Sequence, residues 1–203
     1  MKLSNDMQKD ILLQSFEVLK SDFEANDTEI AEAIGKMADI DIDIAFDMWE
    51  YILDSNPKLI TDNQGYINDN KAYDITSKVL YEINKNIGYF NSAKVIKTRP
   101  KIKEAIFKKS ANVDENQCSI ISQYISEGDL ETANEILKFV SENKYNKGKG
   151  FSETLGGIFQ SILDDLDSDV DENTIEFLHH WIQQIKSPTE RAKANIRFLT
   201  FMK

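Results

Sequence analysis

The chain of 203 residues is 41% hydrophobic, carries eight Gly and three Pro, and contains one cysteine, Cys118. This composition can bury a sizeable core, disfavours turn-dense and Gly-rich folds, and excludes an intramolecular disulfide or an all-cysteine metal site. The net charge of −11 is uneven, since residues 1–60 carry −9, residues 61–112 carry +5 and residues 113–203 carry −7. Such an acidic surface repels nucleic acid and anionic membranes and attracts basic partners, unless it serves only to keep the protein soluble.

No segment has the character of a membrane span or a secretory signal. The first residues, MKLSNDMQKD, lack the apolar core of a signal peptide, and no run of about eighteen apolar residues occurs. A single cysteine fits a reducing compartment. We therefore expect a cytoplasmic protein.

Apolar residues recur three and four positions apart along the chain, which predicts helices and no convincing strand. In the first half, helical segments are expected at 5–23, about 28–37, 41–54, 69–86, 91–98 and 100–109, with a loop at 55–67. In the second half they are expected at 114–126, 129–143, 153–165, 172–186 and 188–202. Pro57 and Gly88 are expected to end helices, whereas Pro100 and Pro188 lie in first turns.

These segments predict an all-α fold of about eight helices, built as irregular stacked α-α hairpins in a solenoid-like or compact arrangement. We expect a single all-helical domain over 1–203, which can be subdivided into units 1–88 and 89–203. The stretch NKYNKGKG at 143–150 predicts a flexible connector.

One helical pattern occurs twice, because DIDIAFDMWEYI at 41–52 matches DLETANEILKFV at 129–140 with an offset of 88 residues. The match extends backwards across a turn, pairing Ile30 with Cys118, Ala33 with Ile121 and Met37 with Ile125. The repeated object is therefore a helical hairpin, in which Ala45 or Ala133 lets the partner helix approach closely. The alternative is a chance match between two amphipathic helices.

At these positions the hairpins resemble tetratricopeptide-like repeats, which are helix–turn–helix units of about 34 residues. The residues that carry the resemblance are Tyr124, the turn EGDLET, Ala133 and Leu137 in the second hairpin, and Ala45, Trp49, Ile52 and Pro57 in the first. The family's Trp and Gly positions hold other residues, namely Glu29 and Ala33 in one hairpin and Gln117 and Ile121 in the other. The resemblance covers about a third of the chain and implies a scaffold that binds proteins or peptides.

The acidic stretch DDLDSDVDENTIE at 164–176 has the oxygen-ligand spacing of a calcium-binding EF-hand loop. Val170, however, stands where that loop needs Gly for its sharp turn. The other interpretation is an acidic loop that caps the helix starting near Glu172. We favour the capping loop and predict no metal site, while cation binding by 164–176 stays open.

The only two histidines, His179 and His180, are adjacent, and on a helix their side chains point about 100° apart, which disfavours a shared metal. We expect one to be partly buried beside Trp181 and the other to face solvent. No Ser–His–acid arrangement and no phosphate-binding Gly-rich loop is recognisable, so we expect no cofactor and no enzymatic activity.

Residues 94–109 carry seven basic residues against one acid, which gives the segment a net charge of +6. Nucleic-acid phosphates could bind these side chains, with Tyr89 and Phe90 upstream for base stacking. The basic residues are Lys94, Lys97, Arg99, Lys101, Lys103, Lys108 and Lys109. The stronger interpretation is internal: the segment lies across the acidic hairpins, or presents Lys residues around a buried stripe of Ile102, Ile106 and Phe107.

We predict a non-enzymatic protein–protein interaction module, of which an acidic inhibitor resembling an immunity protein or antitoxin is one concrete version. Its partner would be another protein of basic character. The candidate partner-binding residues are Asp39, Asp43, Asp47, Trp49 and Glu50. Trp49 either fills the core or lines a binding groove. The alternative function is a helical regulator that binds nucleic acid through 94–109.

Overall fold

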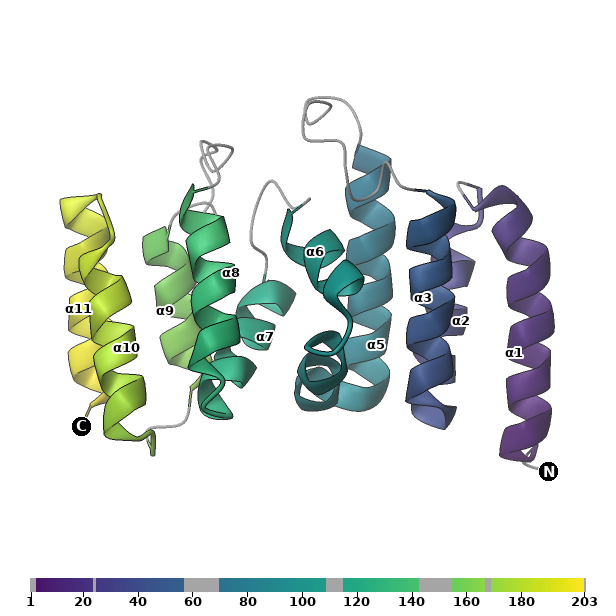
Figure 1. Ribbon diagram of the computed structural model, residues 1–203, viewed down its shortest axis with the longest axis horizontal. Helices are drawn as coiled ribbons and strands as arrows, with labels where there is room; N and C mark the ends of the chain where they lie inside the picture. The colour runs from purple at the N-terminus through teal and green to yellow at the C-terminus, as the bar shows by residue number, and fades with distance from the viewer. Residues whose placement is uncertain are drawn as a thin grey trace. The chain divides into compact units, whose positions relative to one another are not determined.

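A computed structural model describes residues 3–23, 25–56, 70–108, 115–142, 155–166 and 169–202 (Figure 1). Within these ranges the chain forms ten α-helices, one short 3₁₀ helix and no strand, which confirms the all-α prediction. None of the described helices is both long and apolar enough to span a bilayer. The predicted connector at 143–150 and most of the predicted loop at 55–67 lie outside these ranges.

The chain divides into two compact units, residues 1–109 and 110–203. The predicted subdivision after residue 88 falls instead inside the first unit, within α5 (Asn70–Ile96). Gly88 has φ 77° and ψ 159°, a conformation that glycine adopts at little cost, so it interrupts the helix where the sequence predicted an end. The chain resumes a helical path directly afterwards, so the interruption is a kink and not a boundary between units.

The first unit consists of two neighbouring helical hairpins preceded by one further helix. Helix α2 (Asp27–Ile40) packs against α1 (Asn5–Leu19), α3 (Ile42–Ser55) and α5, while α6 (Pro100–Lys108) packs against α3 and α5 (Figure 1). A 3₁₀ turn, η1 (Lys20–Asp22), follows α1. Because α2 contacts α5 and α3 contacts α6, the hairpins α2–α3 and α5–α6 lie side by side.

A glycine lets α2 and α5 come into close contact. A Cβ atom added at Gly35 would lie 2.7 Å from Cβ of Glu82 and 2.9 Å from its carbonyl carbon and oxygen. Gly usually costs about 1 kcal/mol relative to Ala inside a helix. Here the missing side chain allows the backbones to approach, and the sequence pattern had not marked this role.

In the second unit, α7 (Glu115–Ser126) packs against α8 (Leu130–Glu142) and α9 (Leu155–Asp165), while α11 (Pro188–Phe201) packs against α9 and α10 (Glu172–Gln183). The turn after α7 is a Schellman motif. Gly128 has φ 73°, its N–H donates to the carbonyl of Ile125 at 3.0 Å, and the N–H of Asp129 donates to that of Tyr124 at 2.9 Å.

The two matched hairpins, α2–α3 and α7–α8, bury equivalent positions. Ala45 and Ala133 are both fully buried. Four further matched pairs are at most 2% exposed: Ile30 and Cys118, Met37 and Ile125, Trp49 and Leu137, and Ile52 and Val140. The second helices also begin alike, because Asp41 accepts from the N–H of Ile44 at 3.2 Å and Asp129 from that of Thr132 at 3.3 Å. Among the residues described between the two matched hairpins lie α5 and α6.

Asp171 caps the N-terminus of α10, accepting from the N–H of Thr174 at 2.8 Å, so the acidic loop supplies the predicted cap. Two of its residues, 167 and 168, lie outside the described ranges. The prediction that one histidine faces solvent is confirmed, and the prediction that the other is partly buried was wrong, because His179 and His180 are both exposed. The ring of His179 stacks on Phe198, and the ring of His180 meets Trp181 edge-on, without burial of either imidazole.

Candidate protein-binding face

Helix α3 is buried on one side and acidic on the other. Its buried residues are Ala45, Phe46, Met48, Trp49, Ile52 and Leu53. The acidic side comprises Asp43, Asp47, Glu50 and Asp54, which we call the α3 acidic face. These four residues are spaced by four, three and four positions, so they share one stripe of the helix.

Trp49 does not belong to this face. Its side chain is 1% exposed and its ring lies 5.9 Å from that of Phe46, inside the core of the first unit. The prediction that Trp49 binds a partner directly is therefore corrected: the Trp49 side chain packs in the core. The helical spacing of Trp49 points it away from the carboxylates, which explains why one helix can serve both purposes.

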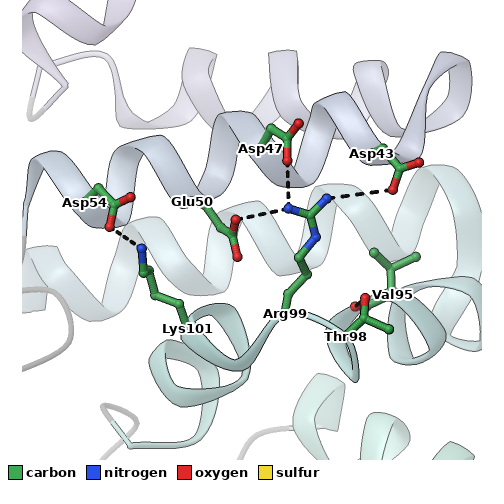
Figure 2. A network of polar contacts seen from close by, with 8 residues as sticks. All are labelled: Asp43, Asp47, Glu50, Asp54, Val95, Thr98, Arg99 and Lys101. Atoms are coloured by element: carbon green, nitrogen blue, oxygen red, sulfur yellow. Dashed lines mark hydrogen bonds and ion pairs between the residues drawn. The ribbon is translucent and has the colours of Figure 1, made fainter.

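The connection between α5 and α6 positions Arg99 opposite the acidic face. The hydroxyl of Thr98 donates to the carbonyl of Val95 at 2.9 Å, and the N–H of Arg99 donates to that of Ile96 at 3.1 Å, which closes a tight turn. Pro100 then begins α6, where its missing N–H costs nothing. Figure 2 shows the Arg99 side chain reaching from this turn toward α3.

Arg99 contacts three carboxylates of α3 at once (Figure 2). Its Nη1 donates to Oδ1 of Asp47 at 2.7 Å and to Oε2 of Glu50 at 3.0 Å, while its Nη2 lies 3.7 Å from Oδ1 of Asp43. Lys101, one residue into α6, forms a further short ion pair with Asp54. A guanidinium presents five N–H donors in a fixed plane, so it can hold several carboxylates in one arrangement.

These ion pairs raise the pKa values of both cations. Partial burial alone would lower the pKa of Arg99, but hydrogen bonds to Asp47 and Glu50 outweigh it and raise the pKa. The hydrogen bond to Asp54 likewise raises the pKa of Lys101. Both cations therefore stay charged at neutral pH, where they pair with the carboxylates of α3.

The acidic face stays accessible despite these contacts. The side chains of Asp43 and Asp47 are 80% and 65% exposed, whereas Arg99 is only 21% exposed. Four carboxylates against two cations leave this patch negative, and a carboxylate that accepts one hydrogen bond keeps lone pairs for further donors. The network thus orders the acids and leaves Asp43 and Asp47 open to solvent, whereas Glu50 is only 26% exposed.

The candidate residues from the sequence separate into distinct groups. Asp43, Asp47 and Glu50 come together around Arg99, whereas Asp39 is exposed in the last turn of α2 and takes no part in that network. Asp54 was not among the candidates, although its spacing after Glu50 extends the same stripe.

Part of the basic segment has a structural role, as the internal interpretation predicted. Arg99 and Lys101 lie across α3, and Ile102, Ile106 and Phe107 form the predicted buried stripe. Lys94 and Lys97 are exposed, and Lys103 is half-buried. The side chain of Lys108 and all of Lys109 lie outside the described part of the chain.

The described residues contain no group of three or more His, Cys, Asp or Glu side chains placed to hold a metal ion. Comparison with protein-family models, curated proteins and solved structures finds no match. The function is therefore argued from the geometry of the α3 acidic face alone.

Proposed function

We propose that the protein is a non-enzymatic scaffold that binds a basic protein partner through the α3 acidic face. The observation that carries this proposal is the Arg99 network, which gathers three carboxylates around one guanidinium while leaving Asp43 and Asp47 largely exposed. Preorganised acids lose less conformational freedom on binding than free side chains do. A Lys- or Arg-rich surface would meet them with complementary charge.

The stacked-hairpin architecture supports this class of function. Helical hairpins that pack side by side present extended surfaces, and binding of proteins or peptides is what the tetratricopeptide-like resemblance implies. Fold alone does not specify a partner, so the charge of the α3 acidic face decides its class. Within this class, a cytoplasmic inhibitor of immunity or antitoxin type, acting on a basic nuclease-like protein, is the concrete version.

A second candidate, nucleic-acid binding, rests on one feature of α5. Phe90 is 52% exposed and lies one helical turn before the exposed Lys94, so an aromatic ring and a cation share one side of the helix. One aromatic ring and one cation offer few contacts to a nucleic acid, and Arg99 and Lys101 already form ion pairs with carboxylates of α3. We therefore place it second.

The two functions separate in one capture experiment. Immobilised protein is exposed to an extract of its own cells and, in parallel, to a labelled oligonucleotide over a series of salt concentrations. The proposal predicts recovery of basic proteins and no oligonucleotide binding that depends on Lys94. If the oligonucleotide binds with a steep salt dependence that Phe90→Ala and Lys94→Ala abolish, while no protein is recovered, the second candidate replaces the first.

A further inference from the structure

The first helix, α1, presents an apolar stripe to solvent. Met7, Ile11 and Val18 are spaced by four and seven residues, so they share one side of the helix, and they are 52%, 50% and 72% exposed. The opposite side packs on the first unit, where Phe16 is buried. An exposed acid immediately precedes each member of the stripe; these acids are Asp6, Asp10 and Glu17, of which Glu17 pairs with Lys20 at 2.6 Å. Asp6 and Asp10 therefore give the stripe an acidic edge.

The last helix, α11, presents a similar stripe with the opposite charge. Ile196 and Leu199 are 67% and 64% exposed, while Phe198 between them faces the core. Lys193 and Arg197 flank Ile196, and their side chains remain 57% and 52% exposed although they pair with Glu190 and Asp164. Exposed ion pairs of this kind are weak and can exchange partners. The stripe of α11 therefore has a basic edge.

Both stripes leave apolar area in water that a second helix would cover. Exposed apolar rows on a helix mark interaction surfaces. The acidic edge of α1 complements the basic edge of α11, whereas two copies of either face would place like charges against one another.

We propose that copies of this chain associate head to tail, with α1 of one copy packed along α11 of the next. The two contacting surfaces differ, so the interface is heterologous, and each added copy leaves one free α1 and one free α11 for further growth. The contact uses neither the α3 acidic face nor Arg99, so it stands independently of the proposed function.

The test uses two variants that each block one face. Ile11→Glu with Val18→Glu places charges in the α1 stripe, and Ile196→Glu with Leu199→Glu does so in the α11 stripe. All four positions are exposed, so both variants should retain the helical circular dichroism of the unmodified protein. A control variant, Tyr81→Glu with Phe90→Glu, removes exposed apolar area from α5 and adds the same charge.

Sedimentation velocity over a concentration series gives the outcome. For the unmodified protein and the α5 control, the average mass of the sedimenting species should rise with protein concentration and exceed the mass of a dimer. Each blocked variant alone should stay monomeric, and an equimolar mixture of the two should form a heterodimer and stop there, because only one intact α1 and one intact α11 remain.

Several results would overturn the proposal. An unmodified protein that stays monomeric at every concentration lacks the contact. Self-association of either blocked variant alone would show that like faces pair. If a blocked variant unfolds, the double variant Asp6→Lys with Asp10→Lys is used in its place. This variant should weaken self-association about tenfold or more, because it removes the charge pairing between the two stripes. An unchanged association would contradict that charge pairing.

Discussion

Arg99 and Asp47 are 52 residues apart in the sequence, yet Nη1 of Arg99 donates to Oδ1 of Asp47 at 2.7 Å. This contact joins the most basic segment of the chain to the acidic side of α3. Two cations of that segment, Arg99 and Lys101, therefore pair with carboxylates of α3, which leaves them less available to contact nucleic acid.

Replacing Arg99 by Ala should lower the stability of the first unit. Asp43, Asp47 and Glu50 would then face one another without a cation, and loss of charged hydrogen bonds typically costs about 1–3 kcal/mol. Arg99→Lys should recover part of that loss, because a single ammonium keeps the charge and loses the planar donors. Chemical denaturation measures both. Lys94→Ala is the control, with an expected change within about 0.5 kcal/mol; an equally stable Arg99→Ala would show that the network does not stabilise the unit.

Replacing Trp49 by Ala should be far more damaging than any change on the acidic side of α3. The side chain is 1% exposed, so its removal leaves a cavity, and such substitutions cost about 3–5 kcal/mol. The exposed Tyr81, changed to Ala, should cost less than about 1 kcal/mol. Thermal unfolding followed by circular dichroism gives the comparison. A Trp49→Ala variant as stable as the unmodified protein would argue that Trp49 lines a surface after all.

Gly35→Ala should destabilise the protein, although alanine normally favours a helix. The new Cβ would lie 2.7 Å from Cβ of Glu82, so α2 and α5 must separate, and overpacking of this kind costs about 1–3 kcal/mol. Lys36→Ala, at the next position on the exposed side, should change stability by less than about 0.5 kcal/mol. The urea concentrations at the unfolding midpoints of the two variants give the comparison. A Gly35→Ala variant more stable than the unmodified protein would mean that α2 and α5 do not approach so closely.

Acid should remove the contribution of the Asp41 cap. The hydrogen bond from Lys9 and then the N–H of Ile44 lower the pKa of Asp41 in the folded protein. The unfolded value is about 3.9, so the carboxylate stabilises the fold fully above that pH, and the contribution disappears as pH falls through the lower folded value. The melting temperature of Asp41→Asn should therefore lie below that of the unmodified protein at neutral pH and approach it below pH about 4. A difference that stays constant with pH would contradict this assignment. Asp39→Asn, outside the network, is the control.

Local features of the fold could be predicted because they depend on neighbouring residues. The cap of α10 from the acidic loop, the interruption at Gly88 and the turn at Gly128 each follow from one residue type and its immediate surroundings. The offset of 88 residues between the two matched hairpins was visible for the same reason, since equivalent buried positions need similar side chains.

Long-range features could not be predicted in the same way. Helical spacing assigns Trp49 to one side of α3, and whether that side meets a core or a groove depends on α2 and α6. Arg99 and Lys101, and not Lys94, pair with α3 because of the turn before Pro100. The exposed histidines and the unit boundary after residue 109 likewise depend on which helices pack together.

Position-matched variants offer a direct comparison between the two hairpins. Adding 88 to Asp43 and Asp47 gives Glu131 and Glu135, exposed acids on α8, while the counterpart of Glu50 is Lys138. Asp43→Asn with Asp47→Asn and Glu131→Gln with Glu135→Gln therefore remove the same total charge from equivalent positions. A partner that responds only to net charge would not distinguish the two variants, whereas one that binds the α3 acidic face would.

The most direct test is quantitative capture of basic proteins from the protein's own cells by the unmodified chain and these two variants. We predict that the unmodified chain and the α8 variant retain the same basic partner, and that the α3 variant, at concentrations well below saturation, loses about 90% of it, as a tenfold weaker affinity would give. Equal retention by all three proteins would contradict the claim that the α3 acidic face is the binding surface.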